Sequence, residues 1–74
     1  MTEQEAFEAL KNGRPVSAKV RVSLDMETFN FQRVNEIQYY YNEKEKRIKC
    51  CVQLLSRNGR SVSTVPVEDV EYLI

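Results

Sequence analysis

Hydrophobic and polar residues follow two different periods along this chain, a helical one at the start and a strand-like one after it. Between residues 2 and 12, Ala6, Phe7 and Leu10 recur at spacings of three and four, with Ala9 beside them. This spacing places apolar side chains on one stripe of a helix. We therefore predict a single helix over residues 2–12.

Local signals mark both ends of this predicted helix. Thr2 and Glu5 have the spacing of a capping box, in which each side chain accepts a hydrogen bond from the other residue's backbone. Gly13 stands where a left-handed cap is favoured, and Pro15 prevents the helix from continuing.

The clearest strand pattern covers residues 16–24, where five apolar residues alternate with four polar ones. Such alternation predicts a half-buried strand with one wet face. Residues 25–30 read as a connection, with Phe29 and Phe31 closing over the core. A second strand is expected over 31–41, and its change of phase near Val34 and Asn35 predicts a bulge there.

The remaining elements follow as hairpins. Residues 42–46 form a charged hairpin loop before a third strand at 47–56. A four-residue loop places Tyr41 opposite Ile48 and Tyr39 opposite Cys50. Asn58-Gly59 predicts a two-residue type I′ hairpin. A fourth strand is expected at 60–65 and ends at Pro66. One turn of 3₁₀ helix at 67–70 and a last strand at 71–74 complete the chain.

These elements predict one domain, with the helix at 2–12 and the strands at 15–74 closing into a small, strongly bent antiparallel barrel. The fold class is therefore mainly β. The expected core consists of Phe7, Leu10, Val16, Ala18, Val20, Val22, Ile37, Tyr39, Ile48, Cys50, Val52, Leu54, Val65, Val70 and Leu73.

The run Thr64-Val-Pro-Val-Glu-Asp-Val-Glu-Tyr-Leu73 resembles the end of a Src-homology-3-like barrel. In that family an apolar residue and a proline close the fourth strand, a 3₁₀ turn follows, and a valine begins the fifth strand. The resemblance implies a five-stranded barrel of this type. The family's aromatic segment and groove tryptophan have no counterpart, and Asp69 stands where a groove tyrosine is usual. Binding of proline-rich peptides is therefore not implied.

The run from Glu5 to Val16 resembles the helix-then-strand opening of small proteins from phages and mobile elements of Firmicutes. Some of these are phage sponge proteins that sequester nucleotide signals of host defence. The glycine- and tryptophan-rich stretch that follows this opening in one sponge family is missing here. The resemblance implies a phage or prophage setting.

Composition narrows the classes of function. The 74 residues include 11 lysines plus arginines and 11 aspartates plus glutamates, so the formal net charge is zero. This balance argues against a dedicated nucleic-acid binder. No apolar run approaches the roughly 20 residues of a membrane span, and the acidic N-terminus is unlike a secretory signal. We expect a protein of the bacterial host cytoplasm that has no membrane contact.

The residue types also argue against catalysis. The chain has no histidine to act as a base for a serine or cysteine nucleophile, and two isolated glycines cannot form a phosphate-binding loop. The adjacent Cys50 and Cys51 point to opposite faces of a strand and cannot complete a zinc site. Glu68-Asp69 is typical of a turn. We expect no enzyme, metal or cofactor.

Basic side chains and one tyrosine are the candidate binding residues. Several of them could converge on a curved sheet as an anion-binding surface, with the tyrosine stacking on a base. The alternative is that they are ordinary solvated strand faces that protect sheet edges. The candidates are Lys19, Arg21, Arg33, Tyr40, Lys49, Arg57 and Arg60.

An apolar patch offers a second kind of site. Tyr40, Cys51 and Leu55 are out of phase with the core and could together contact a partner or a second copy of the chain. Alternatively, Leu55 and Val62 face each other across the hairpin, and the apolar stripe of the predicted helix, with Phe7 and Leu10, covers them. A domain of this size exposes sheet edges, so a homo-oligomer is expected.

Three functions fit these features. The first is a non-catalytic phage or prophage accessory protein that binds and blocks a host protein, as in counter-defence. The second is an oligomeric sponge for a nucleotide second messenger such as a cyclic nucleotide. The third is a structural or regulatory interaction module.

Overall fold

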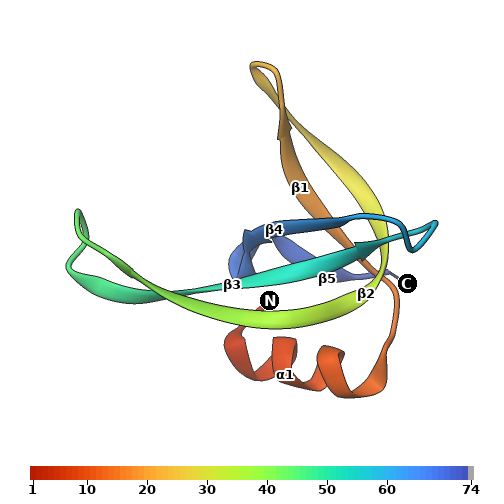
Figure 1. Cartoon of the computed structure of the whole chain (residues 1–74), viewed down its shortest axis with the longest axis horizontal. Helices are drawn as coiled ribbons and strands as arrows, with labels where there is room; N and C mark the ends of the chain where they lie inside the picture. Colours follow the sequence, from red (N-terminus) through yellow and green to blue (C-terminus); the bar gives the residue numbers. More distant parts are fainter. Residues whose placement is uncertain (74) are drawn as a thin grey trace.

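The computed structural model describes residues 1–73 and arranges them as one helix and one sheet (Figure 1). The elements in chain order are α1 (Glu3–Asn12), β1 (Val16–Val22), β2 (Asp25–Asn42), β3 (Arg47–Ser56), β4 (Val62–Pro66), the 3₁₀ helix η1 (Val67–Asp69) and β5 (Val70–Tyr72). The five strands form an open antiparallel sheet in the order β4-β3-β2-β1-β5. The mainly β prediction is confirmed.

The finer barrel assignment is compatible with this strand order, although β4 and β5 are the two open edges of the sheet. A Src-homology-3-like barrel therefore stays a prediction. The expected 3₁₀ turn is present at Val67–Asp69. Of the last predicted strand, residues 71 and 72 lie in β5, and Ile74 lies outside the described residues.

Helix α1 begins and ends as its local signals predict. The Thr2 hydroxyl accepts a hydrogen bond from the Glu5 backbone N–H at 3.1 Å, and the Glu5 carboxylate accepts one from the Thr2 N–H at 2.9 Å. The bond from the Thr2 N–H lowers the pKa of Glu5 because it stabilises the charged carboxylate. Gly13 ends the helix at a φ of 67°, in the left-handed region that glycine adopts without a steric penalty.

The first hairpin corrects the sequence prediction. Strand β1 ends at Val22, two residues before its predicted end, and β2 begins at Asp25, in the segment expected to be a connection. Val22 pairs with Asp25, so the loop has only two residues. Ser23, the first loop residue, has a positive φ of 59°, whereas Leu24 does not have a positive φ. A positive φ at the first loop residue alone is the pattern of a type II′ turn. Serine is uncommon there, so residue types did not reveal the turn.

Strand β2 is long because it pairs with two different strands. Its first part pairs with β1 as far as Phe31, and its second part pairs with β3. The register shifts twice, between Phe31 and Arg33 and between Val34 and Glu36, which confirms the bulge predicted near Val34. Tyr39 faces Cys50 and Tyr41 faces Ile48, as the four-residue loop predicts.

The turn between β3 and β4 differs from the predicted type I′ hairpin. The Gly59 N–H donates to the Ser56 carbonyl, and the Ser56 N–H donates to the Ser61 carbonyl, both at 2.9 Å. Gly59 has a φ of 73°, whereas Asn58 does not have the positive φ that type I′ requires. The loop is therefore four residues wide, and β4 begins at Val62 rather than at residue 60.

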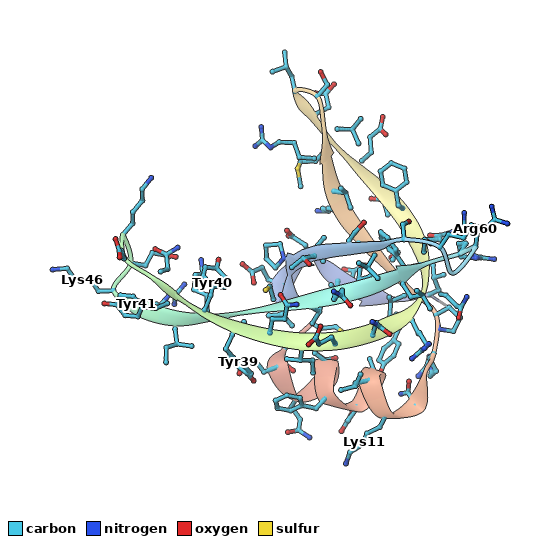
Figure 2. All side chains as sticks on the ribbon, viewed as in Figure 1. Lys11, Tyr39, Tyr40, Tyr41, Lys46 and Arg60 are labelled. Atoms are coloured by element: carbon cyan, nitrogen blue, oxygen red, sulfur yellow. The ribbon has the colours of Figure 1, made fainter. Side chains whose placement is uncertain are left out.

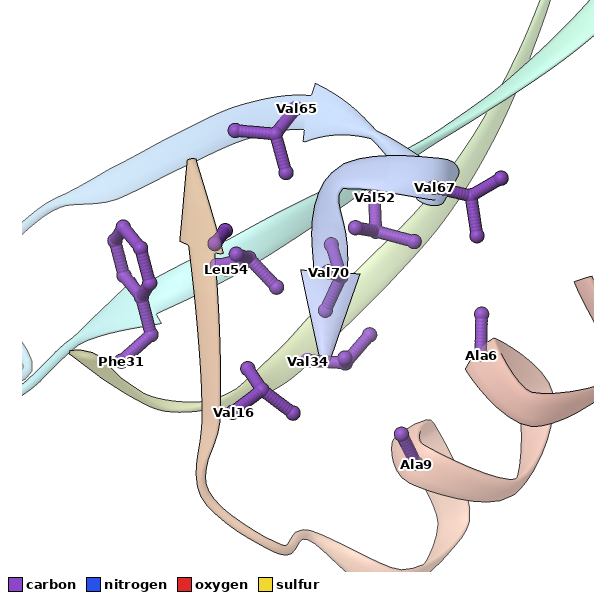
Figure 3. Close-up of a cluster of buried hydrophobic side chains, with 11 residues drawn as sticks. Ala6, Ala9, Val16, Phe31, Val34, Val52, Leu54, Val65, Val67 and Val70 are labelled. Atoms are coloured by element: carbon purple, nitrogen blue, oxygen red, sulfur yellow. The ribbon is translucent and has the colours of Figure 1, made fainter. Parts of the chain in front are cut away.

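The core lies between the inner face of the sheet and helix α1 (Figure 3). Its buried members are Ala6, Ala9, Val16, Ala18, Phe31, Val34, Val52, Leu54, Val65, Val67 and Val70. Val20, Ile37 and Cys50 are half-buried and pack against this cluster. Six of the fifteen residues expected in the core are therefore buried, namely Val16, Ala18, Val52, Leu54, Val65 and Val70.

Five other residues of the predicted core are exposed. Phe7 and Leu10 lie on the flank of α1, because the smallest side chains of that helix, Ala6 and Ala9, are the ones that meet the sheet. Val22, Tyr39 and Ile48 have the correct phase for the inner face, but they lie on outer parts of the sheet that the helix and the other strands cover only in part.

Candidate functional site

The seven candidate binding residues lie on several parts of the sheet. Tyr40 faces Lys49 across β2 and β3, and Figure 2 shows Tyr40 and Arg60 toward opposite ends of the molecule. Within one chain they therefore do not form one surface. The others are Lys19 and Arg21 on β1, Arg33 on β2, and Arg57 in the loop between β3 and β4.

Lys49 already has an anionic partner. Its ammonium group lies 2.5 Å from a carboxylate oxygen of Glu45, which also contacts Arg47 at 3.2 Å. These contacts lower the pKa of Glu45, and the bond to Glu45 raises the pKa of Lys49. Both groups are therefore charged at neutral pH, and Lys49 is less available to an external phosphate than an unpaired lysine.

A groove of about 480 Å³ lies between the β1–β2 hairpin and the β3–β4 loop. The hairpin supplies an apolar wall of Val20, Val22, Phe29 and Phe31. Val22 is 41% exposed and Phe29 is 42% exposed, whereas Phe31 is buried at the base. The volume falls within the range of about 300–1,000 Å³ that is typical of small-molecule pockets.

The opposite wall is polar and comes from the end of β3, the β3–β4 loop and β4. The lining residues on this side are Ser56, Arg57, Asn58, Ser61 and Ser63. The Asn58 side-chain oxygen accepts hydrogen bonds from the Ser56 hydroxyl at 2.7 Å and from the Arg60 N–H at 2.9 Å. The Ser61 N–H donates to the Ser56 hydroxyl at 3.1 Å. These bonds hold the loop in one shape and so position its polar groups in advance.

The groove favours negative charge at one end only. Its lining includes Arg57 and no carboxylate, and within residues 1–73 neither Arg57 nor Arg60 forms an ion pair. Asp25 and Glu27 lie farther along the hairpin, opposite Val22 and Val20. Residues paired across strands share a face. An anion is therefore attracted to the loop wall and repelled from the hairpin tip.

The chain matches no protein-family model, no curated protein and no solved structure. Within the described part of the chain, no helix is long and apolar enough to cross a bilayer. Residues 1–73 also contain no group of three or more potential metal ligands placed to hold an ion.

The two cysteines are free thiols, and both are half-buried. Burial raises the pKa of Cys50 and Cys51, because it disfavours the charged thiolate. Thiolate is the reactive form of cysteine. The raised pKa values therefore make both side chains poor nucleophiles at neutral pH.

The sequence prediction included Arg57 in the site but missed the apolar wall. Val22 was assigned to the core, and Phe29 was placed in a connection. The spacing of Phe29 and Phe31, two residues apart, is a strand signal that could have placed both on one face. The alternative in which α1 covers Leu55 and Val62 is wrong. Leu54 belongs to the buried cluster, so its neighbour Leu55 points to the other face of β3. Val62, which pairs with Leu55, is 48% exposed.

Proposed function

We propose that this protein is a non-catalytic binding protein whose groove holds an anionic ligand with a flat apolar part, and that this ligand is a nucleotide. One observation carries the proposal: the groove brings exposed Phe29 opposite Arg57 and several serine hydroxyls, with no carboxylate in its lining. This corresponds to the second function expected from sequence, a sponge for a nucleotide second messenger in the cytoplasm of a bacterial host.

Each part of a nucleotide has a matching group on one wall of the groove. Phe29 offers an aromatic face on which a base can stack. Arg57 can make charge-assisted hydrogen bonds to phosphate oxygens, and the hydroxyls of Ser61 and Ser63 can donate further ones. Asp25 and Glu27 disfavour the reverse orientation, since it would place phosphates beside carboxylates. The ligand therefore has one preferred direction in the groove.

A panel of cyclic nucleotides, tested by calorimetry and thermal shift, checks this function. A ligand at 100 times its dissociation constant stabilises the folded protein by about 2.7 kcal/mol and raises the melting temperature by several degrees. Arg57→Ala and Phe29→Ser should each weaken binding at least tenfold, the size expected when a charged or stacking contact of about 1.5 kcal/mol or more is lost.

Arg21→Ala and Lys49→Ala are matched controls, since both remove a cation outside the groove. They should leave the affinity unchanged. If no nucleotide shifts the melting temperature, the proposed ligand class is wrong. If the two controls abolish binding and Arg57→Ala does not, the ligand class stands and the proposed location is wrong.

A protein ligand is the second candidate, in line with a phage or prophage accessory protein that blocks a host factor. The hairpin tip beside the groove favours it, because Leu24 is 90% exposed and Met26 is 50% exposed. Exposed apolar side chains of this kind are common at protein interfaces. Affinity capture from bacterial lysate should recover one protein with the native chain and lose it with Leu24→Asp. Recovery of the same protein by both chains would contradict this candidate.

A further inference from the structure

The hydrogen bonds of the β3–β4 loop fix the direction of one side-chain amide, that of Asn58. Its oxygen accepts two hydrogen bonds, one from the Ser56 hydroxyl at 2.7 Å and one from the Arg60 backbone N–H at 2.9 Å. A backbone N–H can only donate, so the amide atom that faces it must be the oxygen and not the nitrogen. The backbone of the loop therefore determines which way the Asn58 amide points.

The nitrogen of the same amide has no partner in the protein. A side-chain amide carries two N–H donors, yet within residues 1–73 no group accepts a hydrogen bond from the Asn58 nitrogen. Asn58 also lines the groove described above. Because its oxygen is already occupied by the loop, the amide has only donors to offer to a ligand.

The neighbouring side chains of this wall are donors as well. Arg57 has five N–H groups and no acceptor. The Ser56 hydroxyl is engaged on both sides, since it donates to Asn58 and accepts from the Ser61 N–H at 3.1 Å. Among the described side chains of the wall, only the hydroxyls of Ser61 and Ser63 can accept a further bond, and they can donate too.

A wall of donors favours a ligand group that only accepts. The ionised oxygens of a phosphate accept hydrogen bonds and donate none, and bonds to charged oxygens are about twice as strong as bonds between neutral groups. A ribose hydroxyl or an amine brings donors, which find few acceptors on this wall. The wall is therefore suited to the phosphate and not to the sugar or base of a nucleotide.

We propose that Asn58 is a specificity-determining residue of the groove, whose amide NH₂ group binds the ligand's phosphate together with Arg57 and so selects a nucleotide over its nucleoside. This inference rests on the proposed function, because it assigns the phosphate of the nucleotide to the β3–β4 loop. The loop holds the amide in place before the ligand arrives, so little ordering of this side chain is lost on binding.

Titration with inorganic pyrophosphate, followed by NMR of side-chain N–H groups, tests the phosphate site without a base. The Asn58 amide and Arg57 guanidinium resonances should shift. The Asn35 amide is the matched control, because its nitrogen already donates to Gln53 at 2.7 Å, and it should not shift. Adenosine, a nucleoside without phosphate, should also leave the Asn58 amide unshifted. An Asn58 amide that stays unshifted at millimolar pyrophosphate overturns the inference.

Asn58→Asp separates recognition from loop structure. This nearly isosteric change keeps one oxygen for Ser56 and Arg60 but replaces the NH₂ group with a charged oxygen. The urea midpoint should stay unchanged, whereas pyrophosphate affinity should fall at least about tenfold, through loss of a bond to a charged group and like-charge repulsion.

Gln32→Glu is the charge control for this variant. Gln32 contacts the Arg57 carbonyl at 3.5 Å, so the change adds the same charge beside the loop but outside the groove lining. It should weaken pyrophosphate binding far less than Asn58→Asp. Equal losses in both variants would mean that net charge and not the Asn58 amide selects the phosphate, which overturns the inference.

This inference and the proposed function fail separately. If nucleotides bind but neither they nor pyrophosphate shift the Asn58 amide, the phosphate lies elsewhere and only this inference is wrong. If pyrophosphate shifts the Asn58 amide and no nucleotide binds more tightly than pyrophosphate, the phosphate site stands and the nucleotide function is wrong.

Discussion

The two hairpins that project from the core share strand β2, yet they present different surfaces. The β1–β2 hairpin faces the β3–β4 loop, so its exposed Val22 and Phe29 form one wall of a groove. The β2–β3 arm, residues 37–52, contacts helix α1 through Tyr39, but no element of the described residues covers Tyr41 and Ile48, which form an open face (Figure 1). The same alternating pattern therefore produces a groove wall in one hairpin and an open face in the other, depending on what lies opposite.

The largest expected effect comes from a charge placed where the β2–β3 arm joins the core. Val52→Asp should prevent folding, because Val52 is 0% exposed and a buried unpaired carboxylate costs more than a small domain can offset. Ile48→Asp lies on the same face of β3 but is 69% exposed, and it should fold. Circular dichroism and urea unfolding check both. A folded Val52→Asp variant would place the boundary between core and arm elsewhere.

A smaller effect locates the same boundary on the β1–β2 hairpin. Phe31 is 6% exposed, and Phe31→Ala should lower the free energy of unfolding by about 3–5 kcal/mol through loss of burial and a residual cavity. Phe29→Ala should lower it by only about 1 kcal/mol, because its side chain is half in solvent already. Equal losses in urea unfolding would mean that Phe29 belongs to the core rather than to a binding wall.

The smallest expected effect concerns Tyr39, which joins the β2–β3 arm to helix α1. Its hydroxyl donates a hydrogen bond to Glu3 at 3.0 Å. Partial desolvation, followed by this bond, raises the pKa of Tyr39 to about 12. A group whose pKa is raised by folding stabilises the folded state. For Tyr39 this contribution is fully present at pH values below the unfolded pKa near 10, and it disappears as the pH rises through about 12.

Ultraviolet titration of the phenolate checks this value. One tyrosine should ionise near pH 12, and Tyr39→Phe should remove that step, whereas the control Tyr41→Phe should keep it. If the step survives in Tyr39→Phe, the contact between the arm and the helix is absent in solution.

Much of the local structure could be predicted from residue types and their spacing. The helix ends depend on Thr2, Glu5 and Gly13, whose hydrogen bonds and backbone angle involve only neighbouring residues. The pairing of Tyr39 with Cys50 depends on loop length, and the bulge near Val34 depends on a change of phase within one strand. Such features do not need information from distant parts of the chain.

The tertiary structure decided which of the patterned faces are covered. Alternation assigns Val52 and Ile48 to the same side of β3. Only the position of α1 and the other strands makes Val52 buried and leaves Ile48 exposed. The groove likewise depends on Phe29 and Arg57, which are far apart in sequence and meet only because β2 and β3 are neighbours. Periodicity specifies the direction of a side chain relative to its own strand, whereas burial depends on what the rest of the chain places above it.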